Sequence, residues 1–367
     1  MNVDIPTLER VGTEDLDALG VGAGILGTGG GGHPRVGKLR LLTLLEDDDY
    51  PDAVEVVQPS DLAADATVAS VGGMGAPTIG VEKLPNGREE INALESIERF
   101  SGREVDALIP GEIGGVNSIV PLCVSLMTGL PVVDADGMGR AFPELQMDTF
   151  FIYGHPVNYA AISDENGNVI SYQDIDSAKR LEDFARAATV DMGGRAGYAF
   201  PLMDGEFVEQ YSITRTLSLI RELGRRVLDA QSGGGDPLGA IRDVVGGQQM
   251  FTGKVTDVLR RNQEGFARGE VTLAALDGDT ELTIEFQNEF LIARSETGSV
   301  LASVPDLICL VDKETALPVT TDALRYGQRL AVLGVPAPEL LKTEAALEVI
   351  GPKAFGYDVD YRPLGDR

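Results

Sequence analysis

The 367-residue chain contains no tryptophan, two cysteines and two histidines. Two cysteines are too few for a disulfide framework or a zinc cluster, and Cys123 and Cys309 each lie in an apolar stretch that is typical of a buried strand or helix. No apolar run is long enough to span a bilayer, and the first residues lack the basic start and apolar stretch of a signal peptide. We therefore expect a cytoplasmic protein whose catalytic groups are mostly carboxylates, hydroxyls and backbone amides.

Basic residues are also scarce: 30 Lys and Arg stand against 58 Asp and Glu, which gives a formal net charge of −28. A field of that sign repels phosphates and anionic lipid headgroups, so we expect neither nucleic acid nor a membrane as a partner. Lysine is especially rare, with 7 Lys against 23 Arg. Two hypotheses explain this bias: adaptation to a salt-rich cytosol, where screening relieves self-repulsion, or a GC-rich genome.

The length predicts two domains, because single hydrophobic cores stop growing well below it. Up to about residue 170, strand patterns alternate with glycine-rich turns and helical patterns. This is the rhythm of a βαβ sheet, in which functional groups gather at the carboxyl ends of the strands. We expect an α/β N-terminal domain (residues 1–170) with a parallel or mixed sheet.

The second part of the chain has a different texture. An amphipathic helix is predicted over residues 214–228, and from residue 251 onward short strand patterns follow one another with turns between them. We expect residues 171–367 to form a β-rich α+β domain, and the protein to be a homo-oligomer.

A glycine tract occupies residues 27–32 and ends at His33. Successive glycines permit unusual backbone angles, and their free N–H groups can bind an anion or an oxyanion. Gly29, Gly30 and Gly31 are therefore candidate substrate-binding residues, and His33 is a candidate acid or base. A helix C-cap with a linker is the alternative explanation, and the tract matches no nucleotide-binding fingerprint.

A second segment places Glu112 directly after a predicted strand and before a Gly-Gly turn that enters a helix. A carboxylate in that position lies close to free backbone N–H groups and is a candidate catalytic group. Asn117 and Ser118 follow as candidate binding residues, although an N-capping role explains both.

The third segment, residues 131–144, is the most unusual. Asp134 and Asp136 alternate at a predicted strand end, so their side chains can point the same way, which suits a divalent cation or a base with its orienting partner. Arg140 can bind a substrate carboxylate or neutralise the aspartates, and Glu144 is a further binding candidate. A structural ion pair around a tight turn is the alternative.

These three segments, in this order, resemble the S-methyl-thiohydantoin desulfurase family, which is encoded beside hydantoinases. The resemblance covers roughly residues 12–362, and the string over residues 131–144 is specific to the family. In the second half it rests on further strings: Gly253-Lys254-Val255, Arg268-Gly269-Glu270, Val304-Pro305-Asp306-Leu307-Ile308, Leu324-Arg325-Tyr326-Gly327, Val335-Pro336-Ala337-Pro338 and residues 351–358.

Membership implies hydrolysis at a cyclic ureide-like ring, in which water replaces the methylthio group and gives a hydantoin and methanethiol. Asp134 or Asp136 is the expected base and His33 the second choice. The family's usual residue after the glycine tract is Asp, and the departure at His33 signals either a different substrate or a different protonation chemistry. The glycine N–H groups and Asn117 would meet developing negative charge, and Arg140 would bind an acidic substituent of the substrate. Whether a divalent metal is bound stays open, because no diagnostic ligand spacing occurs.

Two other functions remain open from the sequence. One is ring-opening hydrolysis of a hydantoin or a 5-oxoproline-like amide, and the other is a non-catalytic partner that binds a hydantoin.

His155 is the weakest catalytic candidate. Asn288 and Glu289 can line a cleft, although their spacing does not require it.

Overall fold

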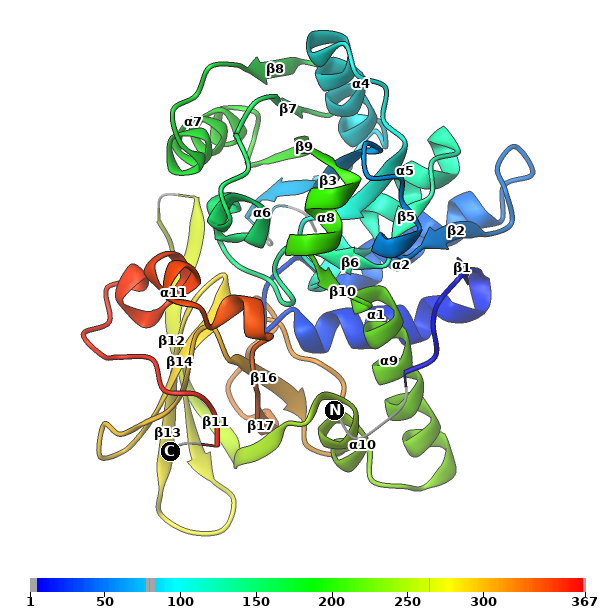
Figure 1. Ribbon diagram of the computed structural model, residues 1–367. Coiled ribbons are helices and arrows are strands. Elements are labelled where there is room, and N and C mark those ends of the chain that lie inside the picture. Colours follow the sequence, from blue (N-terminus) through cyan, green and yellow to red (C-terminus); the bar gives the residue numbers. More distant parts are fainter. Residues whose placement is uncertain (1–4, 77–78, 80–82, 264, 366–367) are drawn as a thin grey trace.

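Eight strands from the N-terminal half and its continuation form one mixed sheet (Figure 1). The structure, a computed structural model, describes residues 5–76, 79, 83–263 and 265–365. In sheet order the strands are β1 (Arg10–Val11), β2 (Val54–Val57), β5 (Val132–Val133), β4 (Ala107–Pro110), β3 (Thr67–Gly75), β9 (Arg195–Asp204), β7 (Ala160–Ser163) and β8 (Val169–Tyr172). The central strands β2, β5, β4 and β3 are parallel and the outer pairs are antiparallel, which confirms the predicted mixed sheet.

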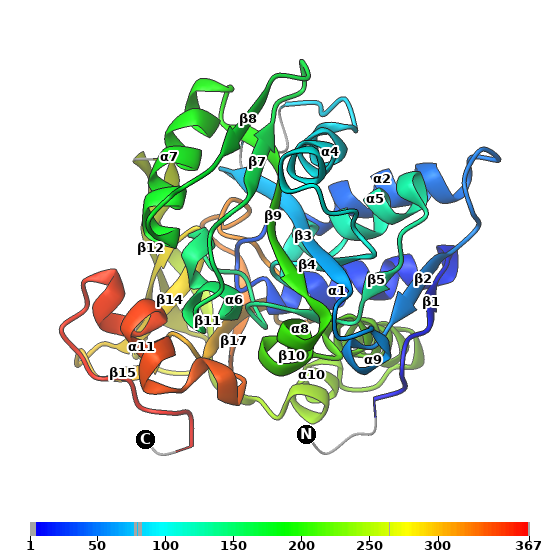
Figure 2. The same cartoon turned by 45° about the horizontal axis from the view of Figure 1, so that its top comes forward.

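Helices cover both faces of this sheet (Figure 2). Val68 and Ile109 pack toward one face while Ala69 and Leu108 pack toward the other, as strand alternation requires. The first face carries α6 (Thr149–Ile152), α7 (Ala178–Asp191) and α8 (Gly205–Tyr211). The second face carries α4 (Glu89–Ser101) and α5 (Val120–Thr128), with α2 (Pro34–Leu45), α1 (Leu16–Leu26), α9 (Thr216–Gly233) and α10 (Pro237–Val245) packed outward from them.

Two glycines allow α1 and α9 to approach closely. A Cβ added to Gly22 on α1 would overlap the carbonyl oxygen of Ile220, and one added to Gly224 on α9 would overlap that of Ala18. Helix α9 and strand β9 both lie beyond residue 170, yet both pack within the first layered unit. The domain boundary near residue 170 stays a prediction.

The C-terminal part forms a second, seven-stranded sheet in which every neighbouring pair is antiparallel. Its strands, in sheet order, are β15 (Val300–Ser303), β14 (Glu289–Ser295), β13 (Glu281–Gln287), β12 (Phe266–Ala275), β11 (Gln248–Gln263), β17 (Arg329–Val335) and β16 (Leu307–Asp312). This confirms the β-rich C-terminal domain. Cys309 and Leu333 face the core that contains α1, so the two units share one apolar interior. Helix α11 (Glu344–Ile350) shares a small apolar cluster with Leu291 of β14. A separate two-stranded sheet pairs β6 (Ala135–Asp136) with β10 (Ile213–Thr214).

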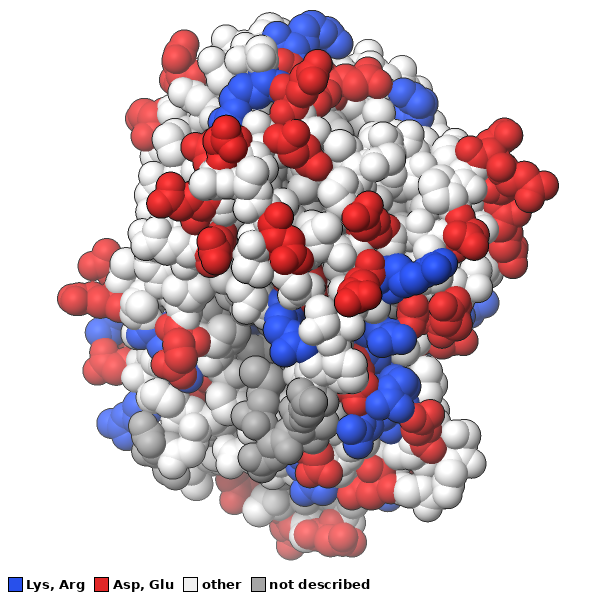
Figure 3. All heavy atoms as spheres, turned by 45° about the vertical axis from the view of Figure 1, so that its right-hand side comes forward, with Lys and Arg blue, Asp and Glu red and all other residues white. Residues whose placement is uncertain are grey.

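Acidic side chains are spread over the face that Figure 3 shows, with basic side chains among them. Residues 46–49, three of them consecutive aspartates, form one fully exposed acidic stretch. Within the part of the chain that the structure describes, no helix is both long and apolar enough to cross a membrane.

This surface leads to a prediction about salt. Because a net charge of −28 repels itself in the folded state, and the Debye length falls to about 3 Å at 1 M salt, molar KCl should raise the free energy of unfolding. Urea unfolding at 0.1 M and 2 M KCl measures this. A midpoint that does not move between these salt concentrations would count against adaptation to salt and leave genome composition as the explanation.

Candidate active site

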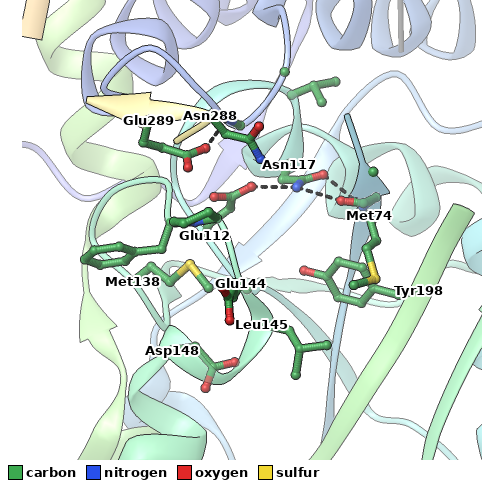
Figure 4. Close-up of a pocket in the computed structure, with 18 of the residues that line it drawn as sticks. Met74, Glu112, Asn117, Met138, Glu144, Leu145, Asp148, Tyr198, Asn288 and Glu289 are labelled. Atoms are coloured by element: carbon green, nitrogen blue, oxygen red, sulfur yellow. Dashed lines mark hydrogen bonds between the residues drawn. The ribbon is translucent and has the colours of Figure 1, made fainter. Parts of the chain in front are cut away.

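A pocket opens between the carboxyl ends of β3 and β4 and the antiparallel sheet (Figure 4). It encloses about 1040 Å³, part of it open to solvent. Its lining comes from the glycine tract, the turns after β3 and β4, the loop over residues 138–148, strand β9, helix α7 and the turn before β14. The pocket therefore draws on both sheets, as the carboxyl-edge rule for parallel strands predicts for one of them.

Glu112 projects into this pocket from the turn after β4, and its side chain is almost fully buried. Asn117 Nδ2 donates a hydrogen bond of 2.6 Å to Glu112 Oε1. The Asn117 amide is itself held by two hydrogen bonds with the backbone of Gly73, one through each of its polar atoms. The other oxygen, Glu112 Oε2, has no hydrogen-bond partner among the described residues. One oxygen is thus fixed, and the other is available to a ligand.

Glu289 faces the same pocket from the antiparallel sheet, at the start of β14. Gly31 N donates to Glu289 Oε1 at 3.2 Å, while Glu289 Oε2 has no partner among the described residues. A Cβ on Gly30 would overlap the Glu289 carboxyl group, so this position needs glycine. The preceding residue, Asn288, adopts a left-handed backbone conformation with φ 57°, which turns the chain so that Glu289 enters the pocket.

The two carboxyl groups have strongly displaced pKa values. Burial raises the pKa of Glu289 to about 8, although the charge of Arg140 and the Gly31 N–H act in the opposite direction. Burial, and then the negative charge of Glu289, raises the pKa of Glu112 well above its ordinary value; the Asn117 hydrogen bond and the nearby Phe142 N–H oppose this only in part. Of the two, Glu289 therefore ionises first, as the pH rises toward 8, and its charge then keeps Glu112 protonated, because two nearby buried carboxylates repel each other.

Arg140 lies behind this pair and is completely buried. All five of its N–H groups are used: Nε donates to Ala141 O, Nη1 to the carbonyls of Pro305 and Asp306, and Nη2 to Thr28 Oγ1 and Phe290 O. Burial lowers the pKa of Arg140 to about 10, and the charge of Glu289 is the main factor that opposes this shift. No N–H group remains for a substrate carboxylate, so the predicted substrate contact of Arg140 does not fit this geometry.

The two predicted catalytic aspartates do not line the pocket. Asp134 accepts hydrogen bonds from the Ser218 N–H (3.0 Å) and hydroxyl and thereby holds the start of α9. Asp136 Oδ2 accepts from the N–H groups of Ile113, Met138 and Gly139, and burial raises the pKa of Asp136 to about 7. The strand is interrupted at Asp134, between β5 and β6, so the expected alternation fails and the two side chains enter separate networks.

The other predicted residues divide in the same way. Gly31, His33, Asn117 and Glu144 line the pocket together with Glu112. His33 is exposed and caps α2, because its Nδ1 accepts a hydrogen bond from the Arg35 N–H at 3.3 Å. A catalytic role for His33 stays a prediction. Glu144 is paired with Lys179 at 2.8 Å. Outside the lining are Gly29, Gly30, Ser118, which donates to Gly115 O, and His155, which packs edge-on against Phe207.

Among the lining residues that sequence reasoning missed are Asp148 and Tyr198. Asp148 lines the pocket and caps the short helix α6, where Phe151 N donates to its Oδ1 at 2.8 Å. Tyr198 reaches the pocket from β9, and its hydroxyl lies against Ser70. The only sequence signal at Asp148 was that of an N-cap, and Tyr198 stood in an unremarkable strand pattern.

Both free cysteines are buried, and within the described ranges no group of three or more His, Cys, Asp or Glu could hold a metal ion.

The displaced pKa of Glu289 leads to a prediction about stability. Its pKa rises from 4.5 to about 8 on folding, so the unfolded chain loses this proton first as the pH rises. The free energy of unfolding should therefore fall between pH 5 and pH 8. Glu289→Gln removes this titration and should reduce the fall by at least about 1.4 kcal/mol, the equivalent of one pKa unit.

Urea unfolding of both proteins at pH 5 and pH 8 measures this difference. The matched control is Glu281→Gln, which replaces an exposed carboxyl of the neighbouring strand and should leave the pH dependence unchanged. An equal fall in stability for wild type and Glu289→Gln would mean that Glu289 titrates normally.

Known protein families and a solved structure match both parts of this chain. The S-Me-THD-like N-terminal domain matches residues 14–174, and the S-Me-THD-like C-terminal domain matches residues 176–364. A crystal structure of a protein from Chromobacterium violaceum is similar, with a TM-score of 0.81 and 26% sequence identity over 97% of this chain and 100% of that chain. No curated protein matches the sequence. The two matched regions contain Glu112 and Glu289, respectively.

Proposed function

Because the chain belongs to the S-Me-THD-like family, we propose that it is a hydrolase of a cyclic ureide-like ring, in which water replaces the methylthio group of an S-methyl thiohydantoin. The products are a hydantoin and methanethiol. The family relationship supports the ring chemistry, and the pocket supplies the groups that such a reaction needs.

The observation that carries the proposal is the pair Glu112 and Glu289. Each carboxyl group is buried, each is fixed through one oxygen, and each has a second oxygen without a partner among the described residues. Two carboxyl groups whose environments separate their protonation states are a usual source of one acid and one base. The burial of two carboxyl groups in one pocket is costly.

We assign the base role to Glu289 and the acid role to Glu112. The charge of Arg140 and the Gly31 N–H favour the ionised form of Glu289. The negative charge of Glu289 then keeps Glu112 protonated, with Oε1 accepting from Asn117 and Oε2 free to donate. As the pH approaches 8 and Glu289 ionises, the two groups thus reach the protonation states that attack by water on a C=N carbon requires.

In this mechanism Glu289 takes a proton from water as the water oxygen bonds to the ring carbon that bears sulfur. Glu112 donates its proton to the adjacent ring nitrogen, which accepts the electron pair of the C=N bond. When the tetrahedral intermediate collapses, its hydroxyl proton returns to Glu112 and the C–S bond breaks. The proton held by Glu289 passes to the departing sulfur, so both carboxyl groups regain their starting states.

An apolar wall completes the pocket beside these carboxyl groups. Met74, Met138, Phe142 and Phe200 line it and are largely buried. Figure 4 shows Met138 next to Glu112, on the same side of the pocket. Such a surface suits a methylthio group and a flat ring, because polarizable thioether and aromatic groups pack well against sulfur.

The test is an assay of purified protein with S-methyl thiohydantoins and the parent hydantoins, at low and high salt. We expect stoichiometric release of methanethiol and hydantoin. Ring opening without thiol release would replace this proposal with an amide hydrolase that uses the same carboxyl pair. Hydantoin binding without turnover of any ring would favour a non-catalytic binding partner.

Two further features belong to the proposal. We place the reaction in the cytoplasm, in keeping with the reduced state of the two buried cysteines. The homo-oligomer stays a prediction, which light scattering of the purified protein tests directly.

A further inference from the structure

The wall of the pocket formed by the loop before α6 carries a third buried carboxyl group, Asp148, which the mechanism above does not use. It is 5% exposed, lines the pocket, and lies at the opposite end of the pocket from Glu289 in Figure 4. Its Oδ1 accepts from Phe151 N at 2.8 Å, and the Phe150 N–H also faces the carboxyl group. These contacts fix the direction of the side chain.

The backbone around Asp148 is shaped to bring it close to Glu112. Gly137 lacks a Cβ where one would touch the Asp148 side chain, and Gly137 N donates to Gly111 O, directly before Glu112. On the other side Thr149 N donates to Gly137 O at 2.7 Å. Asp148 is therefore tied through two short backbone links to the turn that carries the proposed acid.

The charges that face Asp148 favour its protonated form. Burial raises the pKa of Asp148 to about 8, the N–H groups of Phe151 and Phe150 act against this, and the charge of Asp136 adds to it. Tyr198, on β9, and Glu144, which Figure 4 shows beside Asp148, are further titratable groups near it, and burial raises the pKa of the Tyr198 hydroxyl too. No described cation forms an ion pair with Asp148 within 4 Å. At neutral pH the pocket thus contains a carboxylic acid, a strong hydrogen-bond donor, far from Glu289.

A thiohydantoin-type ring needs a donor in this place. When the sulfur-bearing carbon meets Glu112 and Glu289, the carbonyl oxygen that does not react lies on another edge of the ring and requires a hydrogen bond, since an unsatisfied buried carbonyl is costly. We infer that Asp148 positions the substrate by donating a hydrogen bond from its carboxylic acid to this carbonyl oxygen. The identity of the ring in this inference rests on the proposed function.

The inference has a direct consequence for binding. Once Asp148 ionises it becomes an acceptor and repels a carbonyl oxygen, so ligand affinity should fall about tenfold for each pH unit above the pKa. Asp148→Asn keeps the N-cap and offers an N–H donor that does not titrate. Asp148→Ser also keeps the cap, but its side chain is too short to reach the ring, and it serves as a folded variant without the donor.

The experiment is calorimetric titration of hydantoin, the product ring, into wild type and both variants between pH 6.5 and pH 9. We expect the wild-type affinity to fall relative to that of Asp148→Asn above pH 8, with both within about threefold at pH 6.5, the scale of one neutral hydrogen bond. Asp148→Ser should bind at least about threefold more weakly than wild type at pH 6.5. Comparing the two proteins removes the contribution of Glu289, which titrates in both.

A constant ratio of wild-type to Asp148→Asn affinity across this pH range would overturn the inference, and so would the absence of hydantoin binding to folded wild type. The proposed function is judged separately, by methanethiol release. Thiol release with a constant affinity ratio keeps the function and removes the role of Asp148. A ratio of affinities that changes with pH, without thiol release, keeps the role of Asp148 and removes the proposed function.

Discussion

Glu112→Gln is expected to lower kcat for methanethiol release by about 10³-fold, because loss of a positioned general acid typically costs 10²–10⁴. Glutamine preserves the shape of the side chain and can still accept the Asn117 hydrogen bond, but it cannot supply the proton that the ring nitrogen needs. Hydantoin affinity should stay within about threefold of wild type, since the substitution alters only one hydrogen bond to the ligand. Steady-state kinetics and calorimetry measure the two quantities.

Asp134→Asn is the matched control for this experiment, because Asp134 is a buried carboxylate that lies outside the pocket lining and holds the start of α9. We expect it to lower the free energy of unfolding while kcat per folded molecule stays within about threefold of wild type, since no transition-state contact is lost. Turnover by Glu112→Gln above a tenth of the wild-type rate, or a larger loss in Asp134→Asn, would contradict the assignment of the acid.

Arg140→Met is expected to destabilise the fold by about 3–5 kcal/mol, the usual cost of removing one partner from a buried charged network. The substitution leaves five oxygen acceptors without their donor, on the glycine tract, the loop after β6, the start of β14 and the turn before β16. It also removes the positive charge that favours the ionised form of Glu289. Urea unfolding at pH 7 measures the loss.

Arg140→Lys separates the two contributions of this residue. Lysine keeps the charge but replaces five donors in a planar fork by three on a flexible chain, so we expect an intermediate stability and an acid limb of the pH–rate profile close to that of wild type. Arg225→Met, which removes a half-exposed arginine of α9, serves as the control and should cost less than about 1 kcal/mol. A loss of that small size for Arg140→Met would show that the network is not essential.

Local patterns in the sequence predicted most of the architecture. The alternation of apolar strands, glycine turns and amphipathic helices predicted the mixed sheet with its helices, and the run of short strands after residue 251 predicted the antiparallel sheet. Period and turn chemistry are local properties, which a single sequence displays. The continuation of the first sheet through β9 was not predicted, because pairing between strands so far apart in the chain leaves no local signal.

The candidate site was predictable only in part. The glycine tract was expected to bring the backbone close to another group, and a Cβ on Gly30 would indeed overlap a carboxyl group. Its partner is Glu289, which lies 258 residues from Gly31 and meets it only through tertiary packing. The glycine N–H group expected to bind an oxyanion binds this carboxylate instead.

The Asp-rich segment shows the opposite outcome. Its residues are unusual in sequence, yet Asp134, Asp136 and Arg140 all turn inward to hold α9, the Glu112 turn and the start of β14. Buried charged groups in a framework and in a catalytic centre look alike in a sequence, since both need paired polar side chains next to tight turns. Only the direction of each side chain separates the two roles.

The most direct test of the central claim is the reaction of S-methyl thiohydantoin with wild-type protein in H₂¹⁸O, followed by mass spectrometry of the ring product and titration of the released thiol. If water attacks the sulfur-bearing carbon between Glu112 and Glu289, each methanethiol will be accompanied by one hydantoin with a single ¹⁸O in an intact ring. Thiol release without ¹⁸O in the ring, or ¹⁸O in a ring-opened carboxylate, would contradict the account.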